Sequence, residues 1–214
     1  MATTPKKSVA RLEVKKTYKL YINGAFPRSE SGRVYEVLTS KGASIANPSL
    51  ASRKDLRDAV VAARAAQSGW AKATAYNRGQ ILYRIAEMLE GRTDQLVTEI
   101  SLATGVSTKK AHDEVLAAID RWVWYAGWSD KLSAAFGSTN PVSGPYYNFT
   151  IPEPQGVIAV APAESFLSFI DAIAPAIVSG NTVVALVPGS AAIAAMTFAE
   201  VLATSDLPAG VINI

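Results

Sequence analysis

Cysteine is absent from the 214-residue sequence, and histidine occurs once, as His112. The absence of cysteine excludes a disulfide framework, a thiolate metal site and catalysis by a cysteine nucleophile within these residues. A single histidine also excludes a metal site built from several histidines. We expect His112 to be an ordinary surface histidine of a helix, because no partner residue is suggested nearby. The sequence therefore predicts no catalytic residue and no metal ligand.

Long apolar runs are also missing. The longest, at residues 157–163 and 182–187, are far shorter than the roughly 20 residues that a membrane-spanning helix requires. The N-terminal residues show no apolar segment of the kind found in secretory signals. We therefore expect a cytoplasmic protein without a membrane partner.

The composition is that of a folded protein, with 49% hydrophobic and 18% charged residues. The net charge is +3. Much of the positive charge lies near the N-terminus, at Lys6, Lys7, Arg11, Lys15 and Lys16. No aromatic residues alternate with these charges, as they do in many proteins that bind single-stranded nucleic acid. We expect residues 1–17 to form a disordered basic tail, and we expect no nucleic-acid partner.

Turn and strand signals follow this tail. Residues 19–22 alternate in polarity and lead into Asn23-Gly24, a pair that favours a hairpin because both turn residues take positive φ. Residues 33–38 are a further strand candidate. The segment 39–50 is turn-rich, so we expect turns there.

Helical periodicity dominates residues 52–127. Ser52 and Asp55 have the spacing of a capping box at the start of a helix that runs to about Trp70. Further apolar stripes predict helices over residues 76–90, 96–105 and 107–126. The last of these contains an aromatic group more typical of a core or a subunit interface than of a ligand cage: Trp122, Trp124, Tyr125 and Trp128.

Glycine and proline interrupt residues 129–145, and residues 146–151 are aromatic and β-branched, as in a strand. From residue 156 the chain reads as strand, helix, strand, helix, strand. Residues 157–161 and 182–187 are apolar runs that we expect to be strands buried on both faces. Alternating strands and helices indicate a parallel, doubly wound sheet.

Four segments of this region carry a recognisable pattern: Ala174-Pro175-Ala176, Gly180-Asn181-Thr182-Val183-Val184, Ala199-Glu200-Val201-Leu202 and Leu207-Pro208-Ala209-Gly210-Val211-Ile212-Asn213. In order and spacing they resemble the aldehyde dehydrogenase superfamily. Upstream, residues 21–24 are similar to the family's N-terminal hairpin, and residues 62–70 are similar to its first long helix. Residues 153–157 resemble the strand that leads into the family's cofactor sheet.

The resemblance implies an α/β fold in which N-terminal helices pack on the first part of a doubly wound parallel sheet, with a small antiparallel arm used in oligomerisation. It divides the chain into a hairpin and helical part of the cofactor domain (18–140), an arm strand (141–155) and an incomplete Rossmann-like sheet (156–214). The family's catalytic domain follows the point at which this chain ends, so we expect that domain to be absent. The implied cofactor is NAD or NADP.

The family oxidises aldehydes to acids with a cysteine thiolate, a general-base glutamate and an asparagine that stabilises the oxyanion. The chain has no cysteine, the family's glutamate would lie beyond Ile214, and residues 161–166 contain no asparagine. Glu164 and Asp171 lie two helical turns apart and are expected to be a solvated cap and a polar helix residue. The resemblance therefore implies that this chain alone is catalytically inactive.

Cofactor contacts are expected at the carboxyl ends of the strands, where ligands of open α/β sheets bind. The candidate residues are Ala161, Pro162, Ala163, Glu164, Leu186, Val187, Pro188 and Gly189. Alignment from Gly180 places Leu186 and Gly189 where many family members carry the lysine and glutamate that hold the adenosine ribose. Neither side chain replaces those hydrogen bonds, so we expect NAD(P) binding to be weakened or lost.

Several interpretations stay open. The chain is a family member that is inactive alone or, alternatively, a non-catalytic partner subunit of a full-length aldehyde dehydrogenase. A second interpretation is a fragment of a longer enzyme, because natural termini are rare inside a core strand. A third is a small binding module, which nothing in the sequence favours. A three-stranded parallel sheet with an open edge exposes unpaired backbone groups, so we expect a homo-oligomer or a hetero-oligomer.

Overall fold

The computed structural model describes residues 14–214, so most of the predicted basic tail lies outside the described residues. The helices are α1 (Arg53–Lys72), α2 (Ala75–Glu90), α3 (Thr93–Thr104), α4 (Thr108–Trp128), α5 (Leu132–Phe136), α6 (Phe166–Val178), the short 3-10 helix η1 (Gly189–Ala191) and α7 (Ala192–Leu202). The strands are β1 (Thr17–Tyr18), β2 (Val37–Leu38), β3 (Ser44–Pro48), β4 (Ser138–Thr139), β5 (Phe149–Thr150), β6 (Val157–Val160), β7 (Thr182–Ala185) and β8 (Ile212–Asn213). Strand β1 begins at Thr17, which is the last residue of the predicted tail.

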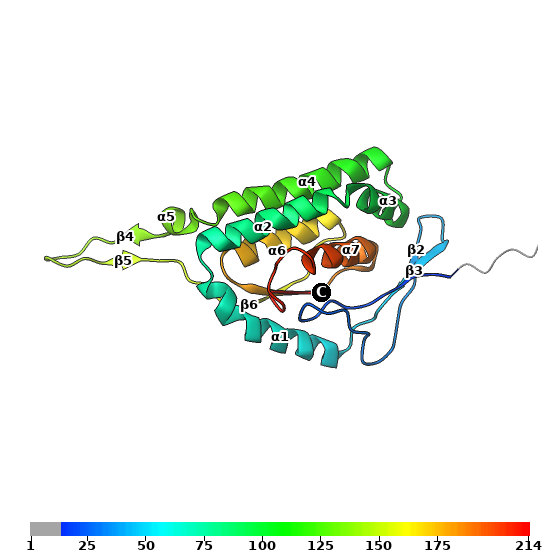
Figure 1. Cartoon of the computed structure of the whole chain (residues 1–214), viewed down its shortest axis with the longest axis horizontal. Coiled ribbons are helices and arrows are strands. Elements are labelled where there is room, and N and C mark those ends of the chain that lie inside the picture. Colours follow the sequence, from blue (N-terminus) through cyan, green and yellow to red (C-terminus); the bar gives the residue numbers. More distant parts are fainter. Residues whose placement is uncertain (1–13) are drawn as a thin grey trace, which may run out of the picture.

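Three parallel strands form a sheet in the order β6-β7-β8. Val157 pairs with Thr182 and Val160 with Ala185, and α6 and α7 connect consecutive strands. Helix α1 lies on one side of this sheet, and the other long helices lie on the opposite side (Figure 1). The Thr182 hydroxyl donates a hydrogen bond of 3.0 Å to the Ala63 carbonyl, which ties α1 to β7. The predicted α/β fold with a doubly wound parallel sheet is confirmed.

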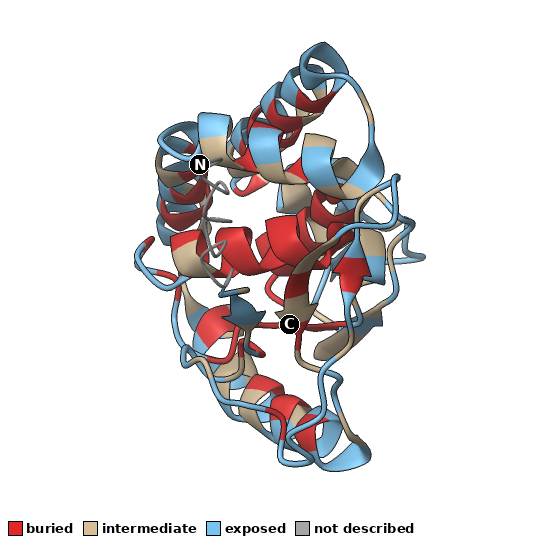
Figure 2. Ribbon diagram, turned by 90° about the vertical axis from the view of Figure 1, so that its right-hand side faces the viewer, coloured by how far each residue is buried: buried red, intermediate tan, exposed pale blue. Residues whose placement is uncertain are grey.

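The core is densest between the sheet and the outer helices, where Figure 2 shows buried residues concentrated in the central helices. Trp122 of α4 stacks on Phe198 of α7, with ring centroids 5.6 Å apart. Phe166 and Phe169 of α6 meet the same Phe198 ring edge-on. Aromatic pairs of this kind contribute about 0.5–1.5 kcal/mol each beyond the burial of area. Trp122 is therefore a core residue, as predicted, and it holds α4 to α6 and α7.

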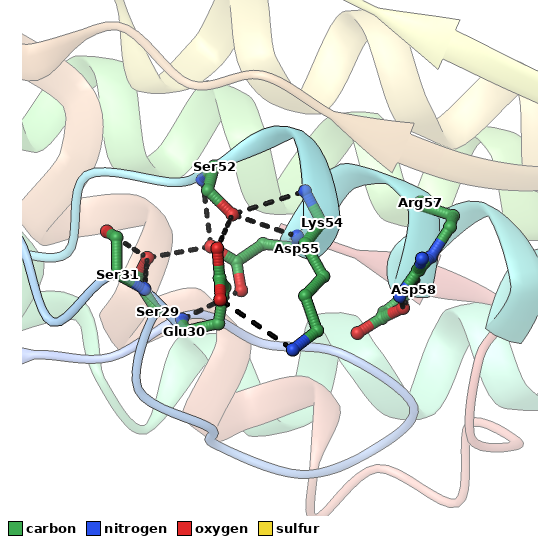
Figure 3. Close-up of polar contacts among 8 residues, drawn as sticks. All are labelled: Ser29, Glu30, Ser31, Ser52, Lys54, Asp55, Arg57 and Asp58. Carbon is green, nitrogen blue, oxygen red and sulfur yellow. Dashed lines mark hydrogen bonds and ion pairs between the residues drawn. The ribbon is translucent and has the colours of Figure 1, made fainter.

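The predicted capping box forms at the start of α1 and also anchors the preceding loop (Figure 3). The Ser52 hydroxyl accepts hydrogen bonds from the backbone N–H groups of Lys54 and Asp55, and Asp55 Oδ2 accepts from the Ser52 N–H at 2.8 Å. The same carboxylate accepts from Ser29 Oγ at 2.7 Å and from the Glu30 N–H at 3.1 Å. One side chain thus caps the helix and holds the loop of residues 29–31 against it.

We expect Asp55→Ala to lower the free energy of unfolding at neutral pH by about 2–4 kcal/mol, because it removes a helix cap and leaves the Ser29 and Glu30 donors unsatisfied. Burial opposes ionisation of Asp55, but hydrogen bonds from Ser29, Ser52 and Glu30 outweigh it and lower the Asp55 pKa. The lower pKa belongs to the folded state, so this stabilisation is complete above the unfolded value of about 3.9 and is lost as the pH falls through the folded pKa.

Urea unfolding at neutral pH and at a pH of about 3 measures this effect. The difference between the wild type and Asp55→Ala should shrink at the lower pH. Asp58→Ala is the matched control, because Asp58 is exposed on the same helix and pairs only with its neighbour Arg57. A difference that is equally large at both pH values would show that the Asp55 charge is not the source of the stabilisation.

The predicted Asn23-Gly24 turn is present, with φ angles of 53° and 73°. Before the turn, however, the chain pairs with the parallel sheet. The backbones of Tyr21 and Ile214 exchange two hydrogen bonds of 2.8 Å each, so the N-terminal segment covers the outer edge of the sheet beside β8. The expectation of an open edge is therefore wrong on this side, because a segment distant in sequence closes it.

Asn213 reinforces this closure from inside the core. Its side chain is fully buried and donates hydrogen bonds to the carbonyls of Val183, at 3.2 Å, and Gly210, at 2.8 Å. Its Oδ1 atom accepts from the Asn23 N–H at 3.0 Å. The amide thus joins β7, the turn before β8 and the N-terminal turn.

A second sheet has the order β1-β3-β2. Strand β3 occupies residues predicted to be turns, so that prediction is wrong. Ala46 of β3 is buried against Val37 and Ile193, and this packing outweighs the local turn composition. Of the strand predicted at residues 33–38, only β2 and a single bridge between Val34 and Ser49 are present.

The prediction that residues 157–161 form a strand buried on both faces is wrong. Strand β6 has no buried residue, and Ala159 is exposed. In the part of the chain that the structure describes, β6 pairs only with β7 and is therefore an edge strand. Strand β7, which lies between two neighbours, is buried along its whole length. It confirms the buried strand predicted at residues 182–187 only as far as Ala185, because Leu186 lies after the strand and is exposed.

Strands β4 and β5 form an antiparallel arm that projects away from the body of the molecule (Figure 1). Only Phe149 and Thr150 of the predicted strand 146–151 pair in a ladder. The arm exposes five large apolar or aromatic side chains, at Val142, Tyr146, Tyr147, Phe149 and Ile151. Among residues 14–214, none of the helices has the length and hydropathy that crossing a membrane requires.

Candidate functional site

The candidate site lies where the loops that follow β6 and β7 meet at the carboxyl ends of the parallel strands. The Leu186 N–H donates to the Val160 carbonyl at 2.9 Å, and Ser190 Oγ donates to the Glu164 carbonyl at 3.4 Å. These contacts bring residues 161–164 and 186–189 to one edge of the sheet, which is where open α/β sheets bind their ligands. The two groups of candidate cofactor residues are therefore neighbours.

The loop after β6 is shaped by the start of α6. Ser165 caps this helix together with Ser168, and the Ser168 hydroxyl donates to the Ala163 carbonyl at 2.8 Å. Ala161, Ala163 and Glu164 are exposed, and Pro162 is half-buried. Ala161, Pro162 and Ala163 carry no side-chain hydrogen-bonding group, so Glu164 is the only ionisable residue of the four.

The carboxylate of Asp171 is engaged elsewhere. It forms an ion pair with Arg121 of α4, with 2.7 Å between Nε and Oδ1. Glu164 makes no ion pair with any residue in the range 14–214. The two carboxylates therefore do not share a partner. Asp171 is a polar residue of α6, as expected, but the expectation that Glu164 is a cap is wrong, because Ser165 is the N-cap of this helix.

The loop after β7 has an apolar wall. Leu186 and Val187 line a cavity of about 250 Å³ that also contains Lys19, Tyr35 and Ser49. Lys19 is the one charged residue among the described residues of that lining. Leu186 is 55% exposed, although it is a large apolar side chain. A leucine at this position offers no hydrogen bond to a ribose hydroxyl, whereas polar contacts at a few points give such sites their specificity.

Gly189 lies against the ring of Tyr35. A Cβ atom at residue 189 would be 3.4 Å from Tyr35 Cε2, so a side chain there would require the ring to move slightly. Burial raises the pKa of the Tyr35 phenol. Pro188, between Gly189 and Val187, is half-buried. Tyr35 therefore occupies space next to the loop that a longer side chain at residue 189 would use.

Sequence reasoning missed both Tyr35 and Lys19 as parts of this site. They belong to the N-terminal segment, and no local pattern distinguishes them from other exposed or half-buried residues. Lys19 lies two residues before Tyr21, whose backbone pairs with Ile214, whereas the Tyr35 N–H donates to the Pro48 carbonyl of β3 at 3.0 Å. Both residues therefore reach the loop after β7 through tertiary contacts of the N-terminal segment. No signal in a single sequence indicates such a contact.

A separate polar cluster lies between α3 and α7. Thr197 Oγ1 donates to Glu99 Oε2 at 2.7 Å, and Gln95 Nε2 donates to Oε1 at 2.9 Å. Burial raises the pKa of Glu99. Burial and the nearby carboxylates of Glu99 and Glu200 raise the pKa of Tyr18 to about 12. The cluster contains no nucleophile that these shifts would activate, and its hydrogen bonds join α3 to α7.

Metal-ligating residues are not grouped in residues 14–214, where no set of three or more His, Asp or Glu side chains is arranged to hold an ion. His112 is exposed in the first turns of α4, as expected for a surface histidine. Among the described residues, the candidate site at the edge of the sheet thus consists of backbone groups, apolar walls, the amino group of Lys19 and the carboxylate of Glu164.

Comparisons with known proteins agree with this fold. The family model described as "Aldehyde dehydrogenase family" matches residues 26–214. The chain is 36% identical to human retinal dehydrogenase 2 over 210 residues, and this alignment covers 95% of the chain and 40% of that protein. It is 34% identical to the cytosolic 10-formyltetrahydrofolate dehydrogenase of Xenopus tropicalis over 218 residues, and this alignment covers 97% of the chain and 24% of that protein.

A solved structure of PnpE in complex with nicotinamide adenine dinucleotide has a TM-score of 0.83 and 28% identity, covering 92% of this chain and 40% of that one. The chain thus spans between 24% and 40% of the length of these proteins. The match runs through the helices, the arm and the parallel sheet. The chain belongs to the aldehyde dehydrogenase family.

Proposed function

We propose that these 214 residues form an aldehyde dehydrogenase family module that does not oxidise aldehydes by itself. The family's NAD(P)-dependent conversion of aldehydes to acids uses a cysteine thiolate, which attacks the carbonyl carbon before hydride is transferred. The observation that carries the proposal is the absence of cysteine from the whole 214-residue sequence. No serine takes its place in the candidate site as a member of a triad, because the single histidine lies on α4.

The residues at the sheet edge also fit a dinucleotide poorly. Leu186 and Gly189 stand where many family members hold the adenosine ribose, and neither donates or accepts a side-chain hydrogen bond. Glu164 is exposed at the end of β6, where its negative charge would oppose a developing oxyanion or a phosphate. We therefore derive no step of the reaction from this site and propose that NAD and NADP bind weakly or not at all.

A second function, that of a non-catalytic subunit, is favoured by the arm. Tyr146, Tyr147, Phe149 and Ile151 are 56–77% exposed, and aromatic residues gathered on one projecting element are typical of protein interfaces. Strand β6 adds an edge with free backbone groups. We propose that the arm and this edge associate with a second copy of the chain or with a full-length aldehyde dehydrogenase.

Calorimetric titration of the chain with NAD and NADP tests the cofactor part, and the appearance of reduced nicotinamide with a panel of aliphatic and aromatic aldehydes tests catalysis. We expect no turnover and no saturable heat at cofactor concentrations up to about 1 mM, the upper end of ordinary KM values. Light scattering after size exclusion reports the oligomeric state. Saturable NAD binding at micromolar concentration, or steady aldehyde oxidation, would contradict the proposal.

A further inference from the structure

A cavity of about 600 Å³ lies at the base of the arm, between the C-terminal end of α4, helix α5 and the end of α6. Its volume is within the range of about 300–1,000 Å³ that small-molecule sites occupy. None of the candidate cofactor residues, at 161–164 and 186–189, lines it. The cavity is therefore separate from the candidate cofactor site and independent of the function proposed above.

Aromatic side chains form much of its wall. Trp124 and Trp128 are one turn apart on α4, and their rings are tilted by 54° with centroids 6.0 Å apart. Tyr125 and Phe136 also line the cavity. Trp124 is 57% exposed and Phe136 is 66% exposed. The buried residues of α4 are Ala111, Val115, Ala118, Ile119 and Trp122, so Trp124 does not belong to the stripe that packs this helix on the core.

The lining of the cavity carries two carboxylates and one guanidinium, which gives it an excess of one negative charge. Glu153 lines it and has no ion-pair partner among residues 14–214, whereas Asp130 pairs with Lys131 at 3.0 Å. Arg78 also lines the cavity, but its guanidinium is directed at the protein backbone. It donates to the Val178 carbonyl at 3.1 Å and to the carbonyls of residues 71 and 73. Arg78 therefore serves the structure of the wall.

We propose that this cavity binds a small organic cation, such as a quaternary ammonium or a protonated amine, between the tryptophan rings and the carboxylate of Glu153. A cation within about 6 Å of a ring centroid is attracted by the negative face of the ring, and tryptophan is the strongest of the aromatic partners. A neutral guest of the same shape gains only the apolar contact.

The test compares two probes of nearly identical shape on the whole 214-residue chain. Choline carries a trimethylammonium group, and 3,3-dimethyl-1-butanol carries a carbon in place of the nitrogen. In calorimetric titrations at constant ionic strength, we expect saturable binding of choline that is at least about tenfold tighter than binding of the alcohol. Equal affinity for the two probes, or no saturable heat with choline, would overturn the proposal.

Variants then locate the binding. Trp124→Ala should weaken choline binding by about tenfold or more and Trp124→Phe by less, while Glu153→Gln should weaken it by about threefold or more and reduce its dependence on salt. Tyr83→Ala is the matched control, because Tyr83 is an aromatic residue of α2 that is 51% exposed and lies outside the cavity. Circular dichroism confirms that each variant is folded. Unchanged choline affinity in Trp124→Ala would also overturn the assignment.

Discussion

Replacement of Gly210 by alanine is expected to lower the free energy of unfolding by about 2–5 kcal/mol, the sum of backbone strain and overpacking. Gly210 ends the turn between α7 and β8 and has a φ angle of +84°. A Cβ atom there would lie 2.7 Å from the Ala62 carbonyl oxygen and 3.1 Å from the Ala66 Cβ. The first contact is with the backbone of α1, which cannot move without disturbing its packing on the sheet.

Gly42→Ala separates the two causes. Gly42 has a φ angle of +80°, but no atom lies within 4 Å of the position that a Cβ atom would occupy there. Alanine at this residue meets only the backbone strain, which costs about 1–2 kcal/mol. Urea unfolding followed by tryptophan fluorescence measures both variants under the same conditions. Equal losses of stability in the two variants would show that the close approach of α1 to Gly210 is not destabilising.

The double substitution Leu186→Lys and Gly189→Glu is expected to raise the affinity for NAD by about 10–100-fold. It introduces two charged hydrogen-bonding groups where many family members hold the ribose, and one such bond contributes about 1.5–3 kcal/mol before the side chains are ordered. Gly189 does not have a positive φ angle, so glutamate fits the backbone there. Tyr35 is the remaining obstacle, and adding Tyr35→Ala should raise the affinity further.

Leu186→Met with Gly189→Ala is the control, because it changes the same positions without adding a hydrogen-bonding group. Calorimetric titration with NAD compares the two pairs of substitutions. We expect no gain in the control. If the variant with lysine and glutamate binds NAD no more tightly than the control variant, the missing ribose contacts do not explain weak binding of NAD at this loop.

Local sequence patterns predicted the helices well. Ser52 and Asp55 marked the start of α1 because a capping box depends only on residues three positions apart. Trp122 was placed in the core by the apolar stripe of α4. Strand β3 and the exposure of β6 were not predicted, because both depend on which segments lie beside a strand. Neighbours of that kind are distant in sequence and leave no periodic trace.

The candidate site shows the same division. Residues 161–164 and 186–189 were placed together by the rule that parallel strands present their carboxyl ends at one edge, and the structure brings these loops into contact. Lys19 and Tyr35 were missed because they reach the site through tertiary contacts, namely the pairing of Tyr21 with Ile214 for Lys19 and the pairing of the segment around Tyr35 with β3 for Tyr35. The cavity beside Trp124 and Trp128 was missed as well, since helical spacing alone indicated core or interface.

The sequence by itself determined which chemistry these residues lack and which faces of its helices are apolar. Both follow from composition and short-range spacing: a chain without cysteine has no thiolate, and an apolar stripe on a helix is buried wherever that helix packs. The tertiary structure alone decided which edge of the sheet is closed, how Tyr35 lies against Gly189, and where Trp124 stays accessible. These features arise from contacts between distant segments, whose free energy depends on the whole packing arrangement.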